Sequence, residues 1–399
     1  MSSVEATDTS GRPGRPGSSD GPARARDDGS RLPSLTGLRF VAAFLVFCFH
    51  ISISGLPAPS STQHAFARAA GAGAVGVSFF FVLSGFVLTW SARPGDTARA
   101  FWRRRAAKIY PNYVVAFVLS VAGLYATGHT VGFLVGAANL GLVQAWWPDP
   151  GVYFGANSVS WSLACEAFFY ALFPVLLPVV RRIRPQRLWA SAAVCVAAVF
   201  AVPVVAVLLP AGRHYWFVYI FPPVRLLEFV LGILMALVVK SGRWPRIPVW
   251  SVAVLLVGAY AVTPYFPPDA ETSAVTVIPF ALLICAVAVA DAEGRRSVWR
   301  SRWAVWLGEI SFAFYLIHQS VIVDLMRGLD AQGSAPAKAW ALIAASLALS
   351  VALAGLMHRF VEVPMMRRLT SRARRDAQRA RPGEGGGGGL GGGAAEGGA

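Results

Sequence analysis

The chain has 399 residues, of which 55% are hydrophobic and only 14% are charged. Soluble domains carry about a quarter of their residues as charged side chains, so this composition excludes an ordinary soluble protein. The net charge of +16 would suit a nucleic-acid-binding protein, but the basic residues cluster between apolar stretches and no nucleic-acid-binding module accompanies them. We therefore predict an all-α polytopic membrane protein whose basic clusters mark cytoplasmic loops.

Both ends of the chain are polar and cannot bury a core. Residues 1–31 are rich in Ser, Gly, Pro, Asp and Arg and are predicted to be a disordered N-terminal tail. Residues 367–399 are basic and then Gly-rich, and are predicted to be a disordered C-terminal tail. This leaves 32–366 as the membrane domain. Because about 30 polar residues precede the first apolar stretch, we expect that stretch to stay as a transmembrane helix rather than a cleaved signal peptide.

Hydropathy predicts ten membrane crossings between these tails. With both termini in the cytoplasm, the inner loops carry most of the arginines and the outer loops carry few, as the positive-inside rule requires. The expected crossings are 35–54, 75–92, 110–126, 160–180, 188–209, 216–239, 247–264, 273–290, 304–325 and 338–358.

The apolar segment 130–145 is long enough to raise the question of an eleventh crossing. If it spanned the membrane, the basic segment 181–187 would lie outside and the charge pattern of every later loop would be inverted. We therefore expect an outer re-entrant or interfacial helix at 130–145.

Three ionisable residues interrupt apolar stretches: His50, Glu166 and His318. Counting 1.5 Å per residue from the predicted helix starts places all three about 21 Å from the inner face of the membrane. Buried ionisable groups are costly and usually mark functional sites, so we predict that these three residues are catalytic. Each of them, taken alone, is also compatible with a polar group that reaches the outer interface.

Other polar residues follow the same helices. Ten residues separate Arg39 from His50, which puts them on nearly the same helix face, although Arg39 is also compatible with an ordinary interfacial anchor. Ser162 and Glu166 share one face of the fourth crossing with Tyr170, and Tyr315 shares a face of the ninth with Ser311 and His318. These polar stripes indicate a cavity.

The densest basic cluster lies in the predicted loop before the third crossing and contains Arg104, Arg105 and Lys108. Their spacing of three or four residues would let them bind phosphates together. Membrane topology alone would also explain this cluster. We read the ion pair Arg225–Glu228 and the four widely spaced cysteines as structural, and we expect no metal site.

Six motifs in order resemble the membrane acyltransferase 3 family: LTGLRFVAAFLVFCFH (35–50), GVSFFFVLSGFVLT (76–89), FWRRRAAKIYP (101–111), SWSLACEAFFYALFP (160–174), ISFAFYLIH (310–318) and RFVEVP (359–364). The resemblance covers about 35–365. It implies a multi-pass enzyme that takes acyl-CoA from the cytoplasm and acylates a sugar or macrolide hydroxyl. No tightly bound cofactor is implied. The scarcity of lysine indicates a GC-rich bacterial genome, and hence a bacterial plasma membrane.

The resemblance also assigns roles to particular residues. The family's Arg and His match Arg39 and His50, with His50 as the catalytic residue, and its glutamate matches Glu166. The basic pair falls on Arg105 and Lys108, where the second member is usually arginine. Lysine binds phosphate as a point charge and lacks the bidentate geometry of arginine.

We expect the donor phosphates to bind Arg39, Arg104, Arg105 and Lys108 while His50 acts as a base or is transiently acylated. Glu166 is expected to orient the His50 imidazole. His318 and Tyr315 are expected to polarise the thioester or position the acceptor, and Ser162 to contribute to binding. A proton-coupled transporter or flippase of a glycosylated small molecule is the alternative function, since buried His and Glu would also relay protons. An inactive scaffold is disfavoured by the presence of all three ionisable residues.

Overall fold

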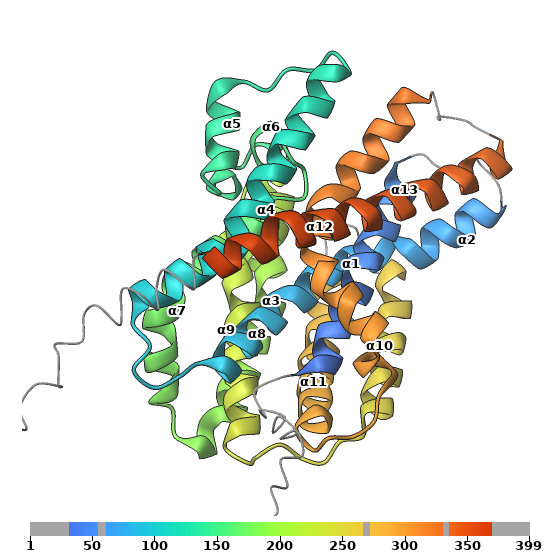
Figure 1. Cartoon of the computed structure of the whole chain (residues 1–399). Helices are drawn as coiled ribbons and strands as arrows, with labels where there is room; N and C mark the ends of the chain where they lie inside the picture. Colours follow the sequence, from blue (N-terminus) through green and yellow to red (C-terminus); the bar gives the residue numbers. More distant parts are fainter. Residues whose placement is uncertain (1–31, 55–60, 266–271, 330–334, 369–399) are drawn as a thin grey trace, which may run out of the picture.

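The computed structural model describes residues 32–54, 61–265, 272–329 and 335–368, and within these ranges it contains helices and no strands (Figure 1). The α-helices are α1 Pro33–Ile53, α2 Ser61–Ala70, α3 Gly76–Ser91, α4 Ala98–Ala126, α5 Phe133–Leu140, α6 Pro150–Tyr153, α7 Trp161–Arg181, α8 Leu188–Ala206, α9 Pro222–Lys240, α10 Val249–Val262, α11 Thr272–Ala292, α12 Arg302–Gly328 and α13 Pro336–Met357. Short 3₁₀ segments are η1 Gly71–Val75, η2 Gln144–Trp146, η3 Pro185–Arg187, η4 Ala211–Arg213, η6 Thr263–Tyr265 and η7 Val298–Arg300, and the π-helical segments are η5 Trp216–Ile220 and η8 His358–Glu362.

The predicted fold class is confirmed. Nine helical segments in the described part of the chain are long and apolar enough to cross a membrane, and each coincides with a predicted crossing. The remaining predicted crossing, 247–264, corresponds to α10, which has 14 residues. Its length of about 21 Å is shorter than a hydrocarbon core of about 30 Å. Residues 1–31 and 369–399 lie outside the described residues, and the side on which the termini lie stays a prediction.

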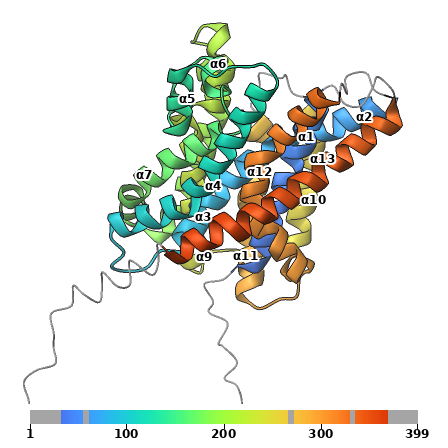
Figure 2. The ribbon, with the colours of Figure 1, turned by 45° about the horizontal axis from the view of Figure 1, so that its top comes forward.

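Segment 130–145 is not a crossing, as predicted. Its helix α5 has eight residues, or about 12 Å, and is followed by a turn and by η2. Phe133 and Leu134 on α5 are exposed. The segment is tied to α4 by the Tyr113 hydroxyl, which donates to the carbonyl of Asn139 at 2.6 Å. Figure 2 shows α5 and α6 at one end of the bundle, with α1 beginning toward the opposite end.

The predicted loop at 101–111 is instead helical. It forms the first turns of α4, which begins at Ala98 because the Thr97 hydroxyl caps it by accepting from the backbone N–H of Ala100 at 3.2 Å. The hydropathy window missed these turns because they carry the basic cluster, and charge lowers hydropathy without lowering helix propensity.

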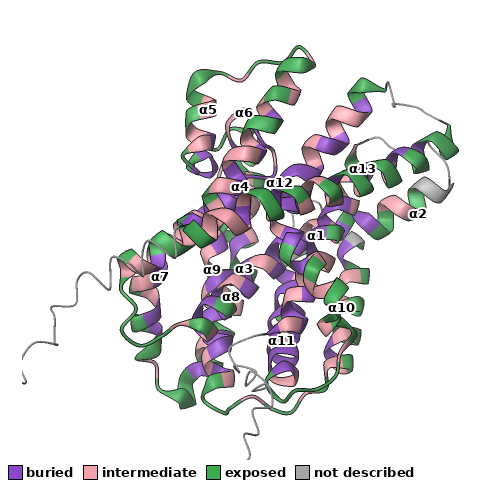
Figure 3. Ribbon diagram, in the orientation of Figure 1, coloured by how far each residue is buried: buried purple, intermediate pink, exposed green. Residues whose placement is uncertain are grey.

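The core lies where α3, α9, α11, α1 and α12 meet, and it is the purple centre of the bundle in Figure 3. Glycines allow the closest approaches. A Cβ at Gly85 of α3 would collide with the backbone of Phe229, and one at Gly232 of α9 with the backbone of Val82, so these two helices touch through their backbones. Gly308 of α12 approaches the carbonyl of Thr36 on α1 in the same way.

Arg225 and Glu228 form the expected ion pair, with 2.9 Å between Nη2 and Oε2. Arg225 Nη2 also donates to the Ser78 hydroxyl at 2.8 Å, and the guanidinium lies over the rings of Phe81 and Tyr219. The pair therefore joins α9 to α3 inside the core, in keeping with a structural role.

Candidate functional site

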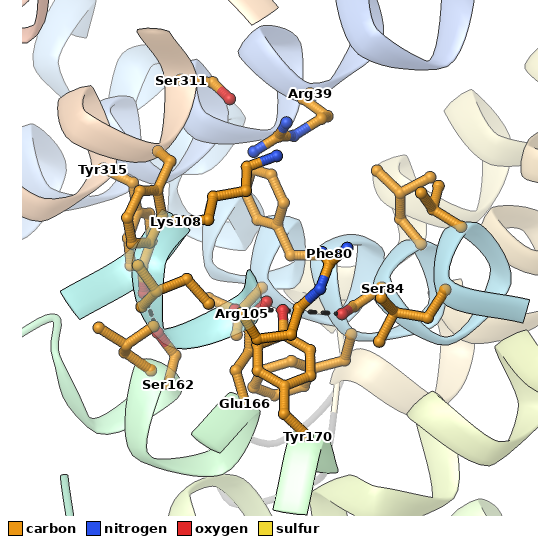
Figure 4. Close-up of a pocket in the computed structure, with 18 residues that line it drawn as sticks. Arg39, Phe80, Ser84, Arg105, Lys108, Ser162, Glu166, Tyr170, Ser311 and Tyr315 are labelled. Atoms are coloured by element: carbon orange, nitrogen blue, oxygen red, sulfur yellow. Dashed lines mark hydrogen bonds between the residues drawn. The ribbon is translucent and has the colours of Figure 1, made fainter. Parts of the chain in front are cut away.

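A pocket inside the bundle collects six of the predicted site residues, which come from α1, α4, α7 and α12 (Figure 4). Its volume is about 140 Å³. We call it the basic pocket. The predicted residues among its lining are Arg39, Arg105, Lys108, Ser162, Glu166 and Tyr315.

The cations of the basic pocket have no ion-pair partner among the described residues. Arg39, Arg105 and Lys108 form no ion pair within 4.0 Å of any described carboxylate, and Arg105 Nε is buried without a hydrogen bond to the described residues. The Glu166 carboxylate accepts from the Tyr170 hydroxyl at 2.9 Å. These three cations are half-buried, and a charge partly withdrawn from water without a partner is costly, so three cations facing one carboxylate favour an anionic ligand.

The positions of these cations follow from how α1 and α4 begin. The first turn of α1 is held by Asp291 of α11, which accepts from the backbone N–H of Ser34 at 2.8 Å and from its hydroxyl at 2.7 Å. One turn later, Arg39 faces the pocket. On α4, Arg105 and Lys108 are three residues apart, so both reach the same pocket.

Arg104 was expected to bind phosphate with its neighbours, but the structure places it outside the basic pocket. Its side chain is exposed and pairs with Asp96, in the turn before α4. One residue along a helix turns the side chain by about 100°, which explains why Arg104 and Arg105 face different surroundings.

His50 is half-buried and His318 is buried, and these two residues, which the depth estimate placed in one layer, lie side by side. His318 Nε2 lies 3.1 Å from His50 Nδ1. His318 Nδ1 is 2.8 Å from the carbonyl of Tyr315, and His50 Nδ1 is 2.9 Å from the carbonyl of Val46. A carbonyl only accepts hydrogen bonds, so each neutral imidazole carries its proton on Nδ1. With this assignment the single Nδ1–H of His50 is shared between the Val46 carbonyl and His318 Nε2, and His50 Nε2 keeps its lone pair.

His50 lines a second pocket, with a volume of about 260 Å³, which we call the histidine pocket. It contains no Asp, Glu, Lys or Arg among its lining residues, which are Val46, Phe49, His50, Ile53, Ala74, Val77, Phe154, Ser158, Val159, Trp161, Tyr215, Tyr219, Tyr315 and Gln319. Six of these side chains are phenylalanine, tyrosine or tryptophan, so the pocket is aromatic and formally uncharged.

Val77 and Tyr315 line both pockets and therefore separate them. Tyr315 is held in place through its hydroxyl, which is 2.8 Å from the Ser162 hydroxyl (Figure 4) and 3.2 Å from the carbonyl of Val159. Its ring also contacts Phe80 edge-on, with 6.0 Å between centroids. The wall between the pockets thus consists of Val77 and of the Tyr315 ring, whose hydroxyl is anchored at the start of α7.

The structure does not bring Glu166 to His50. Glu166 lines the basic pocket and accepts a hydrogen bond from the Tyr170 hydroxyl, whereas His50 is held by Val46 and His318. The depth estimate placed all three ionisable groups in one layer, but depth does not specify the direction in which a side chain points. Sequence reasoning also missed Gln319 and, apart from Tyr315, the aromatic residues of the histidine pocket. The glutamine beside His318 was the one signal available.

Comparison with known proteins identifies the family. A family model described as an acyltransferase domain matches residues 32–359, more than half of the chain. The chain belongs to this acyltransferase family. The acyltransferase is 44% identical over 363 residues to the acyltransferase MdmB of Streptomyces mycarofaciens, which covers 86% of this chain and 93% of the relative.

More distant relatives are longer. The acyltransferase is 24% identical over 373 residues to the O-acetyltransferase OatA of Staphylococcus aureus (strain NCTC 8325 / PS 47), covering 84% of this chain and 57% of that relative. No solved structure matches the chain. Together with the apolar helices, these comparisons show a multi-pass membrane acyltransferase, which favours the enzyme over the transporter considered from the sequence.

Proposed function

We propose that this enzyme transfers an acyl group, acetyl in the first instance, from acyl-CoA in the basic pocket to a hydroxyl of a sugar, glycoside or macrolide in the histidine pocket. The observation that carries the proposal is the contact between two unlike pockets. One presents cations without ion-pair partners in the described chain, the other presents a neutral imidazole, and Tyr315 lines both.

The donor is assigned to the basic pocket by its charge. Phosphate groups of coenzyme A would bind Arg39, Arg105 and Lys108, and Arg105 is suited to bidentate contacts. A pocket of about 140 Å³ holds part of the donor, so the rest of the coenzyme extends beyond it. Glu166, held by Tyr170, limits the net positive charge of the pocket.

His50 is the proposed base. Its Nε2 lone pair takes the proton of the acceptor hydroxyl, and the hydroxyl oxygen attacks the thioester carbonyl. The carbon–sulfur bond breaks, and the coenzyme leaves as a thiol after the protonated His50 returns the proton. While His50 is charged, His318 Nε2 accepts a hydrogen bond from His50 Nδ1 and stabilises the cation. His318 thereby takes the orienting role that the sequence suggested for Glu166.

A covalent route uses the same lone pair. His50 Nε2 would attack the thioester, release the thiol and carry the acyl group to the acceptor. Incubation of the enzyme with labelled acetyl-CoA and no acceptor distinguishes the routes. Label that stays on the denatured protein and is absent from His50→Ala would establish the acyl-histidine.

We propose a bacterial plasma membrane as the location, with the basic pocket open toward the cytoplasm. Ser158 lines the histidine pocket, whereas Ser297 caps η7, which packs against the beginning of α1. In a chain without its four native cysteines, Ser158→Cys should react with an impermeant thiol reagent in intact cells, and Ser297→Cys should react after lysis only. Equal labelling of both in intact cells would reject this orientation.

Purified enzyme in detergent should transfer labelled acetyl from acetyl-CoA to at least one member of a panel of methyl hexopyranosides and glycosylated macrolides. His50→Ala should not. Absence of transfer by folded wild-type enzyme would overturn the proposal. Proton-driven uptake of the same compounds into proteoliposomes would instead establish the transporter.

A further inference from the structure

The histidine pocket contains a polar side chain for which the proposed chemistry has no use. Gln319 follows His318 on α12 and lines the pocket, and its Oε1 is buried without a hydrogen bond to the described residues. Its neighbour Ser320 points elsewhere, to Ser120 of α4 at 2.6 Å. The two residues after His318 therefore differ: the serine is paired within the protein, and the glutamine faces a cavity.

A buried amide oxygen without a partner costs free energy, so a native protein usually keeps one where a ligand or water satisfies it. Nothing in the lining of this pocket carries a formal charge. The missing partner is therefore a neutral donor such as a hydroxyl group, and the amide N–H groups of the same side chain can donate a hydrogen bond to the ligand as well.

The surfaces around Gln319 indicate the shape of that ligand. Tyr215 directly precedes the π-helical segment η5 and Tyr219 lies within it, with 5.5 Å between their ring centroids, and the ring centroid of Trp161 lies 4.9 Å from that of Tyr219. The Tyr219 hydroxyl is already used, since it donates to the carbonyl of Ala74 at 3.0 Å. These rings thus supply aromatic surface to the pocket, and Gln319 adds an amide whose Oε1 has no hydrogen bond to the described residues.

We propose that Gln319 binds a second hydroxyl of the acceptor, one that is not acylated, and so determines which hydroxyl reaches His50. The proposal rests on the proposed function and narrows its acceptor. The acceptor then carries at least two hydroxyl groups on a body with an apolar face. A glycoside meets this requirement, and a simple long-chain alcohol does not. Gln319 positions this substrate and takes no part in proton transfer.

The test compares Gln319→Met, which keeps the length of the side chain and removes its hydrogen bonds, with the matched control Ser320→Ala. The acceptor is the best substrate of the glycoside panel, and its analogues each lack one hydroxyl. Gln319→Met should lower kcat/KM for the acceptor about three- to tenfold, the usual effect of one neutral hydrogen bond. The KM for acetyl-CoA should be unchanged, and so should all constants in Ser320→Ala.

With wild-type enzyme, kcat/KM for one deoxy analogue should be lower than for the parent acceptor by the same factor. With Gln319→Met, kcat/KM for that analogue and for the parent acceptor should be equal. This readout separates binding from a merely structural role, which would affect all analogues alike. If no deoxy analogue is impaired with the wild type, the inference is wrong whether or not the variant folds. An unchanged acceptor kcat/KM in active Gln319→Met would also overturn it while leaving the proposed function intact. Absence of transfer by the wild type to every glycoside would overturn both.

Discussion

The basic pocket and the histidine pocket share Val77 and Tyr315, yet the charges of their lining residues differ. The first carries three cations and one carboxylate, and the second carries no formal charge. Charge attracts an anionic donor over a distance and holds it strongly, whereas an aromatic wall discriminates by shape. Two substrates that meet at one bond can therefore be recognised by independent physical means.

The two pockets also differ in how the helices supply their residues. The cations stand on the first turns of α1 and α4, where Asp291 and Thr97 anchor the backbone. The aromatic residues of the histidine pocket come from α1, α12, the start of α7, the end of α6 and the π-helical segment η5 with its preceding residue. Substitutions in the two sets should therefore separate donor effects from acceptor effects, and each prediction below tests that separation.

The largest effect is expected at the histidine pair. His50→Ala removes the Nε2 lone pair and should lower kcat by at least about 100-fold, because general acid–base catalysis contributes about that much or more. The KM for acetyl-CoA should change little, since the cations lie in the other pocket. Transfer of label from acetyl-CoA, with membrane abundance checked by immunoblot, provides the measurement. His64→Ala, at an exposed histidine on α2, is the control. Activity above a tenth of wild type would contradict the assignment of His50.

A smaller but selective effect is expected at the basic pocket. Arg105→Ala and Lys108→Ala should each raise the KM for acetyl-CoA about 10- to 100-fold, the range for hydrogen bonds to charged groups. The acceptor KM should stay nearly constant. Arg104→Ala is the matched control, because Arg104 pairs with Asp96 outside the pocket and its loss should leave the donor KM unchanged.

The same assay tests the lysine at position 108, where the family usually has arginine. Lys108→Arg should be tolerated and should lower the donor KM if a bidentate contact forms. If Arg105→Ala and Lys108→Ala fold normally in gel filtration and keep the wild-type donor KM, the cluster is a topological anchor and the donor binds elsewhere.

Much of this arrangement could be predicted from the sequence because two of its determinants are one-dimensional. Hydropathy located the crossings. Residue counts from the helix starts placed His50 and His318 at one depth, and in the structure 3.1 Å separates His50 Nδ1 from His318 Nε2. The stripe of Ser162, Glu166 and Tyr170 lines one pocket because spacing along a helix determines which residues share a face.

The direction in which each face points could not be predicted. It depends on how the helices pack, for example on the close contact at Gly308 that sets α1 against α12. For that reason Glu166 was expected beside His50 and lies in the basic pocket, and Arg104 was grouped with Arg105. Gln319 went unnoticed because a neutral amide carries no charge to mark it in an apolar helix.

The next prediction concerns Tyr315, which separates the two pockets. Tyr315→Phe loses the hydroxyl that contacts Ser162 and Val159, so the ring is held less firmly and water reaches the donor more often. Hydrolysis of acetyl-CoA without acceptor should rise about fivefold, the equivalent of one hydrogen bond. Tyr219→Phe is the control, since that side chain lines the histidine pocket only. Equal hydrolysis in the two variants would show that Tyr315 is not the barrier.

The smallest effect distinguishes two roles for Glu166. Its carboxylate lines the basic pocket with Arg39, Arg105 and Lys108, and Gln at this position still accepts from Tyr170 while removing the negative charge. If Glu166 acts there, Glu166→Gln should lower the KM for acetyl-CoA about two- to fivefold, the size of a solvent-screened charge interaction. The kcat of acyl transfer should fall by less, because His50 is oriented by Val46 and His318. Steady-state kinetics with each substrate varied in turn provide both constants. A strong loss of kcat at constant donor KM would instead place Glu166 with the histidine pair, and the two pockets would then share their catalytic machinery.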